Sequence, residues 1–152
     1  MNILKVLTPN RIIGNFGERA AVKFLKRNGY RVLKVNYISD GSEIDIIAKK
    51  NKVLAFIEVK SRNIKSVDAM GLRPASAVTP EKQRHIISAA RHYLSRNPHE
   101  GRMRFDIIEV YLEKVGVRSK VKEIKHLESC FNLNTAYDAK YYYKRKKEGS
   151  NL

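Results

Sequence analysis

The stretch that decides the fold runs from Glu43 to Lys60 and has the sequence EIDIIAKKNKVLAFIEVK. Two apolar-rich segments, residues 43–48 and 53–60, flank a polar connection at residues 49–52. β-Branched residues are frequent in both segments, and a short polar connection between two such segments is typical of a β-hairpin. The stretch therefore predicts two neighbouring antiparallel strands.

Alternation along these strands determines which side chains lie together, because successive residues point to opposite faces of a sheet. A connection of even length pairs the strands symmetrically. The expected pairs are Ile47 with Leu54, Asp45 with Phe56, and Glu43 with Glu58. This register places four polar side chains on one face: Glu43, Asp45, Glu58 and Lys60. The other face is wholly apolar and is expected to be covered; it holds Ile44, Ile46, Ala48, Ala55, Ile57 and Val59.

The acidic face of the hairpin needs a balancing charge. Three carboxylates that converge beside an apolar layer repel one another, which raises their pKa values and costs stability. Lys60 supplies one positive charge, and a divalent cation is expected to supply the rest. Carboxylate oxygens with few other ligands favour Mg²⁺ or Mn²⁺. Such an ion orients water, lowers the pKa of that water and stabilises charge on a phosphate. Lys60 is placed to orient or deprotonate the water, or to steady the pentavalent phosphate.

A simpler interpretation is that these acids are solvated residues on an exposed sheet face. For an isolated Glu-X-Lys triplet that interpretation is the better one. Two acids on one strand that face Glu-X-Lys on the next, in a basic chain, favour a site instead. Glu18 lies on the flank of an expected apolar helix stripe, and it is either a surface residue or an inward-facing ligand.

The elements before the hairpin follow from periodicity and turn residues. Helical spacing of apolar residues predicts a helix over residues 10–28, with Gly29 at its end. A strand is expected at residues 30–37, followed by a turn at Asp40-Gly41-Ser42.

After the hairpin, residues 61–78 show no clear period and are expected to form a long mobile loop. Thr79-Pro80-Glu81 begins a second helix that runs to about Arg96. Two further strands are expected at residues 104–112 and 117–127. The order α-β-β-β-α-β-β predicts a single α/β domain with a central mixed sheet flanked by helices.

Composition narrows the class of protein. The 152 residues fit one domain, and a hydrophobic content of 43% is enough for a core. The single cysteine, Cys130, excludes an internal disulfide framework and favours a reducing compartment. One cysteine and four dispersed histidines do not fit a structural zinc site. No apolar run approaches the roughly 20 residues of a membrane span, and residues 1–8 do not resemble a secretory signal. We expect a cytoplasmic protein without a membrane partner.

The charge balance points to a polyanionic partner. Lys and Arg number 31 against 15 Asp and Glu, which leaves a net charge of +16. Such an excess favours nucleic acid, because neutralising phosphates releases condensed counterions. Charge alone does not separate nucleic acid from a ribosomal or anionic-membrane partner. We place the folded domain at residues 1–130 and expect residues 131–152, rich in Lys, Arg and Tyr, to form a flexible basic tail.

Together these residues resemble the YraN-type uncharacterised protein family over about residues 12–128. The segments that carry the resemblance are residues 14–21, Gly29-Tyr30, Asn36, residues 43–48, residues 56–62, Lys82 and Arg104-Phe105-Asp106. That family is assigned to the restriction-endonuclease-like superfamily, with PD-(D/E)XK nuclease motifs akin to those of archaeal Holliday-junction resolvases. Ile44 stands where the motif is named for a proline, as is usual for this family, and Ser42 separates Gly41 from the acidic pair.

The resemblance implies roles for individual residues. Asp45 matches the first acid of the motif, Glu58 the second and Lys60 the lysine. Glu18 matches the helix acid that resolvase-like members place beside the metal, and Glu43 belongs to the acidic pair with a less settled role. The implied metal ligands are therefore Asp45, Glu58, Glu18 and Glu43, with Mg²⁺ or Mn²⁺ as the cofactor. Resolvase relatives act as dimers, so the resemblance also suggests a homodimer.

Three cations near the expected site are candidates for contacts with nucleic acid. Lys82 opens the second helix, and Arg62 and Arg73 lie in or near the expected loop. Each is equally well explained as ordinary surface charge. Three functions follow: a metal-dependent endonuclease acting on branched or single-stranded DNA, a non-catalytic nucleic-acid-binding protein on the same fold, or a partner of the ribosome or of anionic membrane.

Overall fold

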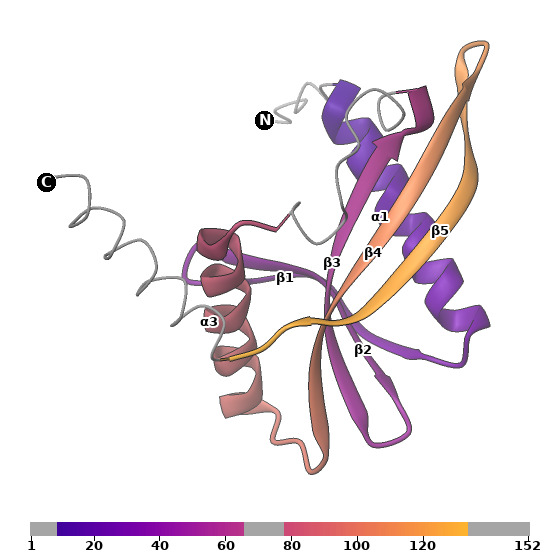
Figure 1. Cartoon of the computed structure of the whole chain (residues 1–152). Coiled ribbons are helices and arrows are strands. Elements are labelled where there is room, and N and C mark those ends of the chain that lie inside the picture. The colour runs from indigo at the N-terminus through magenta and orange to yellow at the C-terminus, as the bar shows by residue number, and fades with distance from the viewer. Residues whose placement is uncertain (1–8, 66–77, 134–152) are drawn as a thin grey trace, which may run out of the picture.

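The computed structural model describes residues 9–65 and 78–133, with side chains from residue 15 onward. The elements in chain order are α1 (Pro9–Arg27), β1 (Arg31–Ser39), β2 (Ser42–Lys50), β3 (Val53–Asn63), α3 (Pro80–Arg96), β4 (Arg102–Val115) and β5 (Arg118–Phe131). The strands form one sheet in the order β1-β2-β3-β4-β5. β3 and β4 run parallel, whereas the other neighbouring strands are antiparallel. This mixed sheet confirms the expected α/β class and element order (Figure 1).

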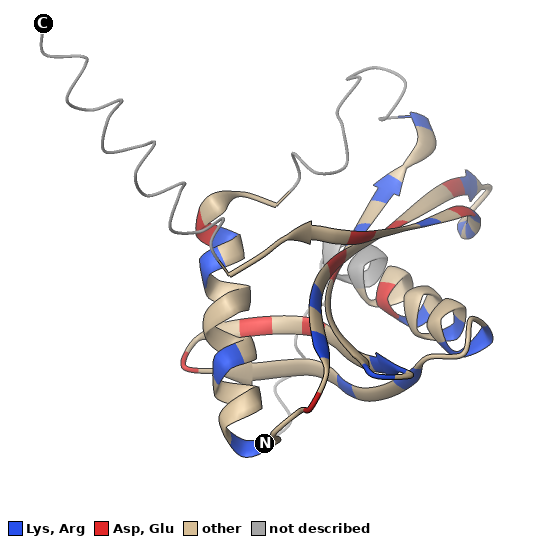
Figure 2. Cartoon of the chain, turned by 60° about the horizontal axis from the view of Figure 1, so that its bottom comes forward, with Lys and Arg blue, Asp and Glu red and all other residues tan. Residues whose placement is uncertain are grey.

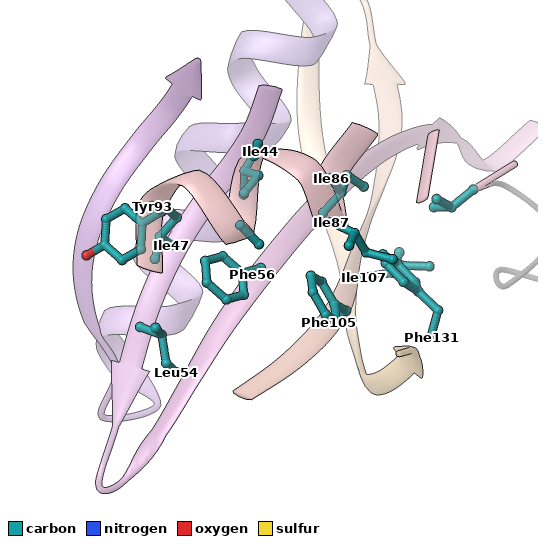
Figure 3. Close-up of a cluster of buried hydrophobic side chains, with 13 residues drawn as sticks. Ile44, Ile47, Leu54, Phe56, Ile86, Ile87, Tyr93, Phe105, Ile107 and Phe131 are labelled. Atoms are coloured by element: carbon teal, nitrogen blue, oxygen red, sulfur yellow. The ribbon is translucent and has the colours of Figure 1, made fainter. Parts of the chain in front are cut away.

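The two long helices cover opposite faces of the sheet (Figure 1). On one face, α3 contributes Ile86, Ile87 and Tyr93 to a core that contains Phe56 of β3 and Phe105 of β4 (Figure 3). On the other face, residues of α1 pack against all three central strands: Ala21 and Leu25 meet Ile46, Ile57 and Ile108. The sheet is therefore the middle layer of three.

The end of α1 and the start of α3 lie where their capping residues predict. Gly29 adopts a φ of 81°, and the Tyr30 N–H donates to the Leu25 carbonyl at 3.0 Å, which terminates α1. At the start of α3, the Thr79 hydroxyl accepts a hydrogen bond from the Lys82 N–H at 3.2 Å. These caps fix where Glu18 and Lys82 stand relative to the sheet.

The hairpin register differs from the expected one by two residues. Lys50 pairs with Val53, so the connection is the dipeptide Asn51-Lys52 rather than the four residues 49–52. Asn51 has a φ of 53°, which a tight two-residue turn requires and which asparagine tolerates. Ile47 consequently faces Phe56 instead of Leu54. Because both connection lengths are even, the parity of the faces is kept within the paired part of the hairpin.

Alternation along β2 is broken near its start. Ile44 packs in the core under α3, whereas Ile46 and Ala48 pack under α1. The expectation that these three share a face is therefore wrong for Ile44. The pairing of β2 with β3 begins only at Ile46, so residues before it are not held by the alternation of that ladder.

The segment after the hairpin is more ordered at its start than expected. Residues 61–63 do not begin a loop but continue β3, because Ser61, Arg62 and Asn63 pair with β4. Residues 66–77, with Arg73, lie outside the described residues, as does the tail from residue 134. Phe131 ends β5 and is buried. In the described part of the chain, no helix is long and apolar enough to cross a membrane.

Candidate functional site

The candidate site lies where β2 separates from β3. The last pair of their ladder is Ile46 with Ile57, and Asp45 is the next residue on β2. The half-buried Asp45 carboxylate accepts a hydrogen bond of 2.7 Å from the Val59 backbone N–H. The Asp45 side chain, and not a backbone carbonyl of β2, thus accepts the hydrogen bond of this β3 N–H. The same contact holds Asp45 beside Glu58, the residue before Val59.

Glu58 is buried, with 3% of its side chain exposed, and two ammonium groups approach it. Lys60 Nζ lies 3.0 Å from Oε1, and Lys82 Nζ of α3 lies 3.5 Å from Oε2. Among the described residues, Oε2 has no hydrogen-bond partner. A buried carboxylate without full compensation is costly, so this oxygen is available to a stronger ligand.

Glu18 reaches the cluster because α1 packs closely on β3. A Cβ on Gly17 would collide with the Ser61 hydroxyl, so only glycine lets the helix lie this near the strand. The pKa of Glu18 is raised, first by burial and then by the charges of Glu43 and Glu58. A hydrogen bond with the Asn36 side chain opposes this rise. Glu18 is therefore a half-buried residue that meets Asn36 of β1 at the edge of the cluster.

Asn36 occupies a special backbone position in β1. Its φ is 52°, and it stands between the pairs Val35–Ile46 and Tyr37–Ile44, opposite Asp45. A positive φ is uncommon outside glycine, and asparagine is among the residues that accept it. The spacing rules for strands give Asn36 no role, although an asparagine inside a β-branched segment is the signal that could have drawn attention to it.

The electrostatics of Asp45 reflect a shortage of positive charge. Burial and the nearby Glu58 carboxylate raise the pKa of Asp45 from 3.8 to about 7, and the charge of Glu18 adds to the rise. The Val59 N–H and the Lys82 ammonium lower it without cancelling the effect. Two lysines are therefore not enough to keep every carboxylate of the cluster fully ionised at neutral pH.

The structure thus brings together most of the residues singled out by sequence: Glu18, Asp45, Glu58, Lys60 and Lys82. Glu43 is exposed and contributes its charge from the periphery. Arg62 is engaged elsewhere, since its Nε donates to the fully buried Glu109 at 3.2 Å. Among residues 15–65 and 78–133, no three His, Cys, Asp or Glu side chains are arranged to hold a metal ion.

A cavity opens beside Glu18 between α1 and β1. It has a volume of about 530 Å³, and its lining combines the site residues Glu18 and Asn36 with cations of α1. The cations are Arg19, Lys23 and Lys26. Lys and Arg positions follow the described part of α1 toward its C-terminal end (Figure 2). A polyanion could therefore approach the carboxylate cluster along a positively charged helix.

The family model and the similar proteins of known sequence all point to one family. Residues 17–110 match the model of the uncharacterised protein family UPF0102, a range that contains every described site residue. A UPF0102 protein of Pelobacter propionicus is 42% identical over 127 residues, which cover 82% of this chain and 85% of that protein. One from Chlorobium phaeobacteroides is 43% identical over 122 residues, covering 78% and 93%. One from Clostridium perfringens is 38% identical over 125 residues, covering 82% and 97%. The chain belongs to the uncharacterised protein family UPF0102.

Proposed function

We propose that this protein is a Mg²⁺- or Mn²⁺-dependent nuclease of the restriction-endonuclease-like type that hydrolyses phosphodiester bonds in DNA. The observation that carries the proposal is the convergence of Asp45, Glu58 and Glu18, from three separate elements, on one place. Two lysines stand at the same place, in a chain with a net charge of +16. Carboxylates for a hard cation and cations for a phosphate are the two requirements of metal-assisted phosphodiester hydrolysis.

The donor chemistry of the cluster fits a divalent cation, although the side chains are not in a chelating arrangement. Glu58 Oε2 is buried without a hydrogen-bond partner among the described residues, and the nearest cation, Lys82, is 3.5 Å away. The raised pKa of Asp45 supports a cation at this place, because added positive charge stabilises the ionised carboxylate. Asp45 and Glu58 would hold the ion, with Glu18 as an additional oxygen ligand. When bound, the ion would polarise a phosphate and lower the pKa of an attacking water.

The protein's own groups have separate tasks in this scheme. The Val59 N–H holds one oxygen of Asp45 in place. Asn36 orients the Glu18 carboxylate. Lys60, which lies 3.0 Å from Glu58 and is partly exposed, carries positive charge to the place where a phosphate would stand.

The decisive experiment is cleavage of end-labelled duplex, branched and single-stranded DNA by the purified full chain with Mg²⁺ or Mn²⁺. We expect cleavage by the wild type and its loss in Asp45→Asn and Glu58→Gln. The matched control is Arg91→Ala, an exposed position on α3, which should retain activity. Cleavage that persists unchanged in Asp45→Asn comes from another enzyme or another site and contradicts the proposal.

A second function has one observation in its favour. Lys60 and Lys82 already contact both oxygens of Glu58, which is the arrangement expected if the fold binds DNA without a metal. A non-catalytic nucleic-acid-binding protein would show salt-dependent affinity with no cleavage and no stabilisation by divalent ions. The same assay with thermal melting in Mn²⁺ separates the two functions.

A further inference from the structure

A second concave surface lies between α1 and β5, away from the carboxylates. It is a groove of about 320 Å³ with an apolar floor made by Phe16, Ala20, Phe24, Val121 and Ile124. Phe24 packs edge-to-face against His126 with ring centroids 6.2 Å apart, so it is part of the supporting structure. Phe16 instead has 37% of its surface exposed and offers a ring to a ligand.

The rim of the groove is basic. Its charged lining residues are Arg19, Lys23 and Arg27, which follow one another at four-residue intervals on α1. Four residues of α-helix advance about 6 Å, so these cations form a row along one side of the helix. None of the three forms a salt bridge with an acid in residues 15–65 or 78–133, and no acid lines the groove.

The groove is joined to the candidate site by shared residues. Arg19 and Lys23 line both this groove and the cavity of about 530 Å³ that contains Glu18 and Asn36. The row of cations on α1 therefore forms a ridge between the carboxylate cluster and the apolar floor. No acid lines the groove, so a phosphate backbone that crosses this ridge from the cluster meets positive charge in the groove.

We infer that the groove binds an unpaired nucleic-acid strand, with a base on the Phe16 ring and phosphates on Arg19, Lys23 and Arg27. This rests on the proposed function and names its substrate class: nucleic acid with a single-stranded segment beside the bond that is cut. A duplex keeps its base faces stacked inside and offers phosphates alone, which leaves the apolar floor unused. An aromatic platform beside cations that follow the backbone is how sequence-independent single-strand binding works.

The test measures binding and not cleavage, so its result is independent of the nuclease proposal. The full chain in EDTA is titrated into fluorescent 12-nucleotide single-stranded DNA, single-stranded RNA and duplex DNA, followed by anisotropy. We expect Phe16→Ala to weaken single-strand binding roughly 5- to 100-fold and Phe16→Tyr to retain it, with little change for the duplex. Lys23→Ala should reduce the slope of log affinity against log salt by about 0.7 for the single strands. The two single strands show whether the groove prefers DNA or RNA.

The control variant is Arg91→Ala, which removes the same charge from α3 on the opposite side of the sheet. Arg91→Ala should leave unchanged the loss of single-strand affinity that Phe16→Ala causes. It should lower the slope of log affinity against log salt less than Lys23→Ala does. Equal losses for Phe16→Ala on single strands and duplex, or equal slopes for the Lys23 and Arg91 variants, overturn the inference. Single-strand binding that depends on Phe16, without any metal-dependent cleavage, would support the proposed groove and contradict the proposed nuclease activity. Metal-dependent cleavage together with unchanged single-strand affinity in Phe16→Ala would support the nuclease activity and contradict the groove.

Discussion

The backbone N–H of Val59 donates a 2.7 Å hydrogen bond to the Asp45 carboxylate, and this contact organises the candidate site. Glu58 and Lys60, the neighbours of Val59 in sequence, are in contact with each other at 3.0 Å. One peptide group of β3 therefore fixes the acid of the adjacent strand while its flanking residues supply a second acid and a cation. The spacing of Glu-X-Lys matters because both side chains must flank that N–H.

The first prediction concerns pH and the metal-free protein. The pKa of Asp45 is raised from 3.8 to about 7 in the folded state, so the folded chain holds this proton more tightly than the unfolded chain. The associated stability is fully present below about pH 4 and is lost as pH rises through about 7. Asp45→Asn removes this titration and can still accept from the Val59 N–H. In EDTA, the variant should therefore gain stability relative to the wild type between pH 5 and pH 8, as measured by urea unfolding.

Adding Mn²⁺ supplies the complementary measurement for this prediction. A divalent ion binds the ionised carboxylate, so it should stabilise the wild type more at pH 8 than at pH 5 and have little effect on Asp45→Asn. If the free energy of unfolding depends on pH in the same way in the wild type and in Asp45→Asn, with and without Mn²⁺, Asp45 does not carry the raised pKa and does not hold the ion.

The second prediction tests whether Lys82 occupies the place of a metal ion beside Glu58 or only stabilises the fold. Lys82 lies 3.5 Å from Glu58 Oε2, the oxygen without a hydrogen bond in the described structure. Lys82→Met should lower metal-free stability by about 1–3 kcal/mol, because it leaves a buried charge less compensated. The same change should tighten Mn²⁺ binding in calorimetry, since the ion no longer competes with the ammonium group.

Arg84→Met is the matched control, because Arg84 is exposed on the same helix and forms no salt bridge with a described residue. It should alter neither the stability nor the Mn²⁺ affinity by a comparable amount. Weaker Mn²⁺ binding in Lys82→Met than in wild type would mean that Lys82 supports the ligand arrangement instead of occupying its place.

Local sequence patterns were sufficient for the order of the strands and helices and for the grouping of Asp45, Glu58 and Lys60, although they ended β3 before Ser61. They were insufficient for the register, which depends on whether Asn51 adopts a positive φ and so shortens the connection. The ladder ends at the pair of Ile46 with Ile57, so Asp45 is held beside Glu58 by its hydrogen bond with the Val59 N–H and not by strand pairing.

Tertiary packing decided what the sequence left open. Gly17 lets α1, which carries Glu18, approach Ser61 of β3, a contact between residues that no local pattern relates. Glu109 is an acid in an apolar strand that is fully buried, where the Arg62 guanidinium and the Tyr111 hydroxyl meet it. Alternation along β4 places Tyr111 on the same side as Glu109, but it gave no sign of Arg62, which the parallel pairing of β3 and β4 brings to Glu109.

The third prediction tests the approach of α1 to β3. Gly17→Ala places a methyl group against the Ser61 hydroxyl and Cβ, which are too close for ordinary contact. We expect a loss of about 1–3 kcal/mol, typical of overpacking, in urea unfolding. Ser61→Gly removes both clashing atoms, so the double variant should recover most of the stability lost by Gly17→Ala. Additive losses in the double variant would show that the helix and strand do not meet at this pair.

The fourth prediction assigns Arg62 to the fold and not to a nucleic-acid contact. The Arg62 side chain is 22% exposed, and its Nε lies 3.2 Å from Oε1 of Glu109, whose side chain is 0% exposed. Burial and the hydrogen bond to Glu109 raise the pKa of Tyr111 to about 12, so this hydroxyl stays a donor and cannot replace the missing positive charge. Arg62→Met should therefore destabilise the protein by roughly 3 kcal/mol, the lower end for a buried pair because the arginine is partly exposed.

Glu109→Gln combined with Arg62→Met provides the decisive comparison, because the double variant buries no unpaired charge and Tyr111 keeps an acceptor. Its stability should exceed that of Arg62→Met alone, which urea unfolding at pH 7 measures directly. At a salt concentration where both remain folded, the double variant should also retain the salt dependence of DNA binding seen in wild type. A slope reduced by about 0.9 for duplex DNA would instead identify Arg62 as a phosphate contact, since each neutralised phosphate contributes that amount.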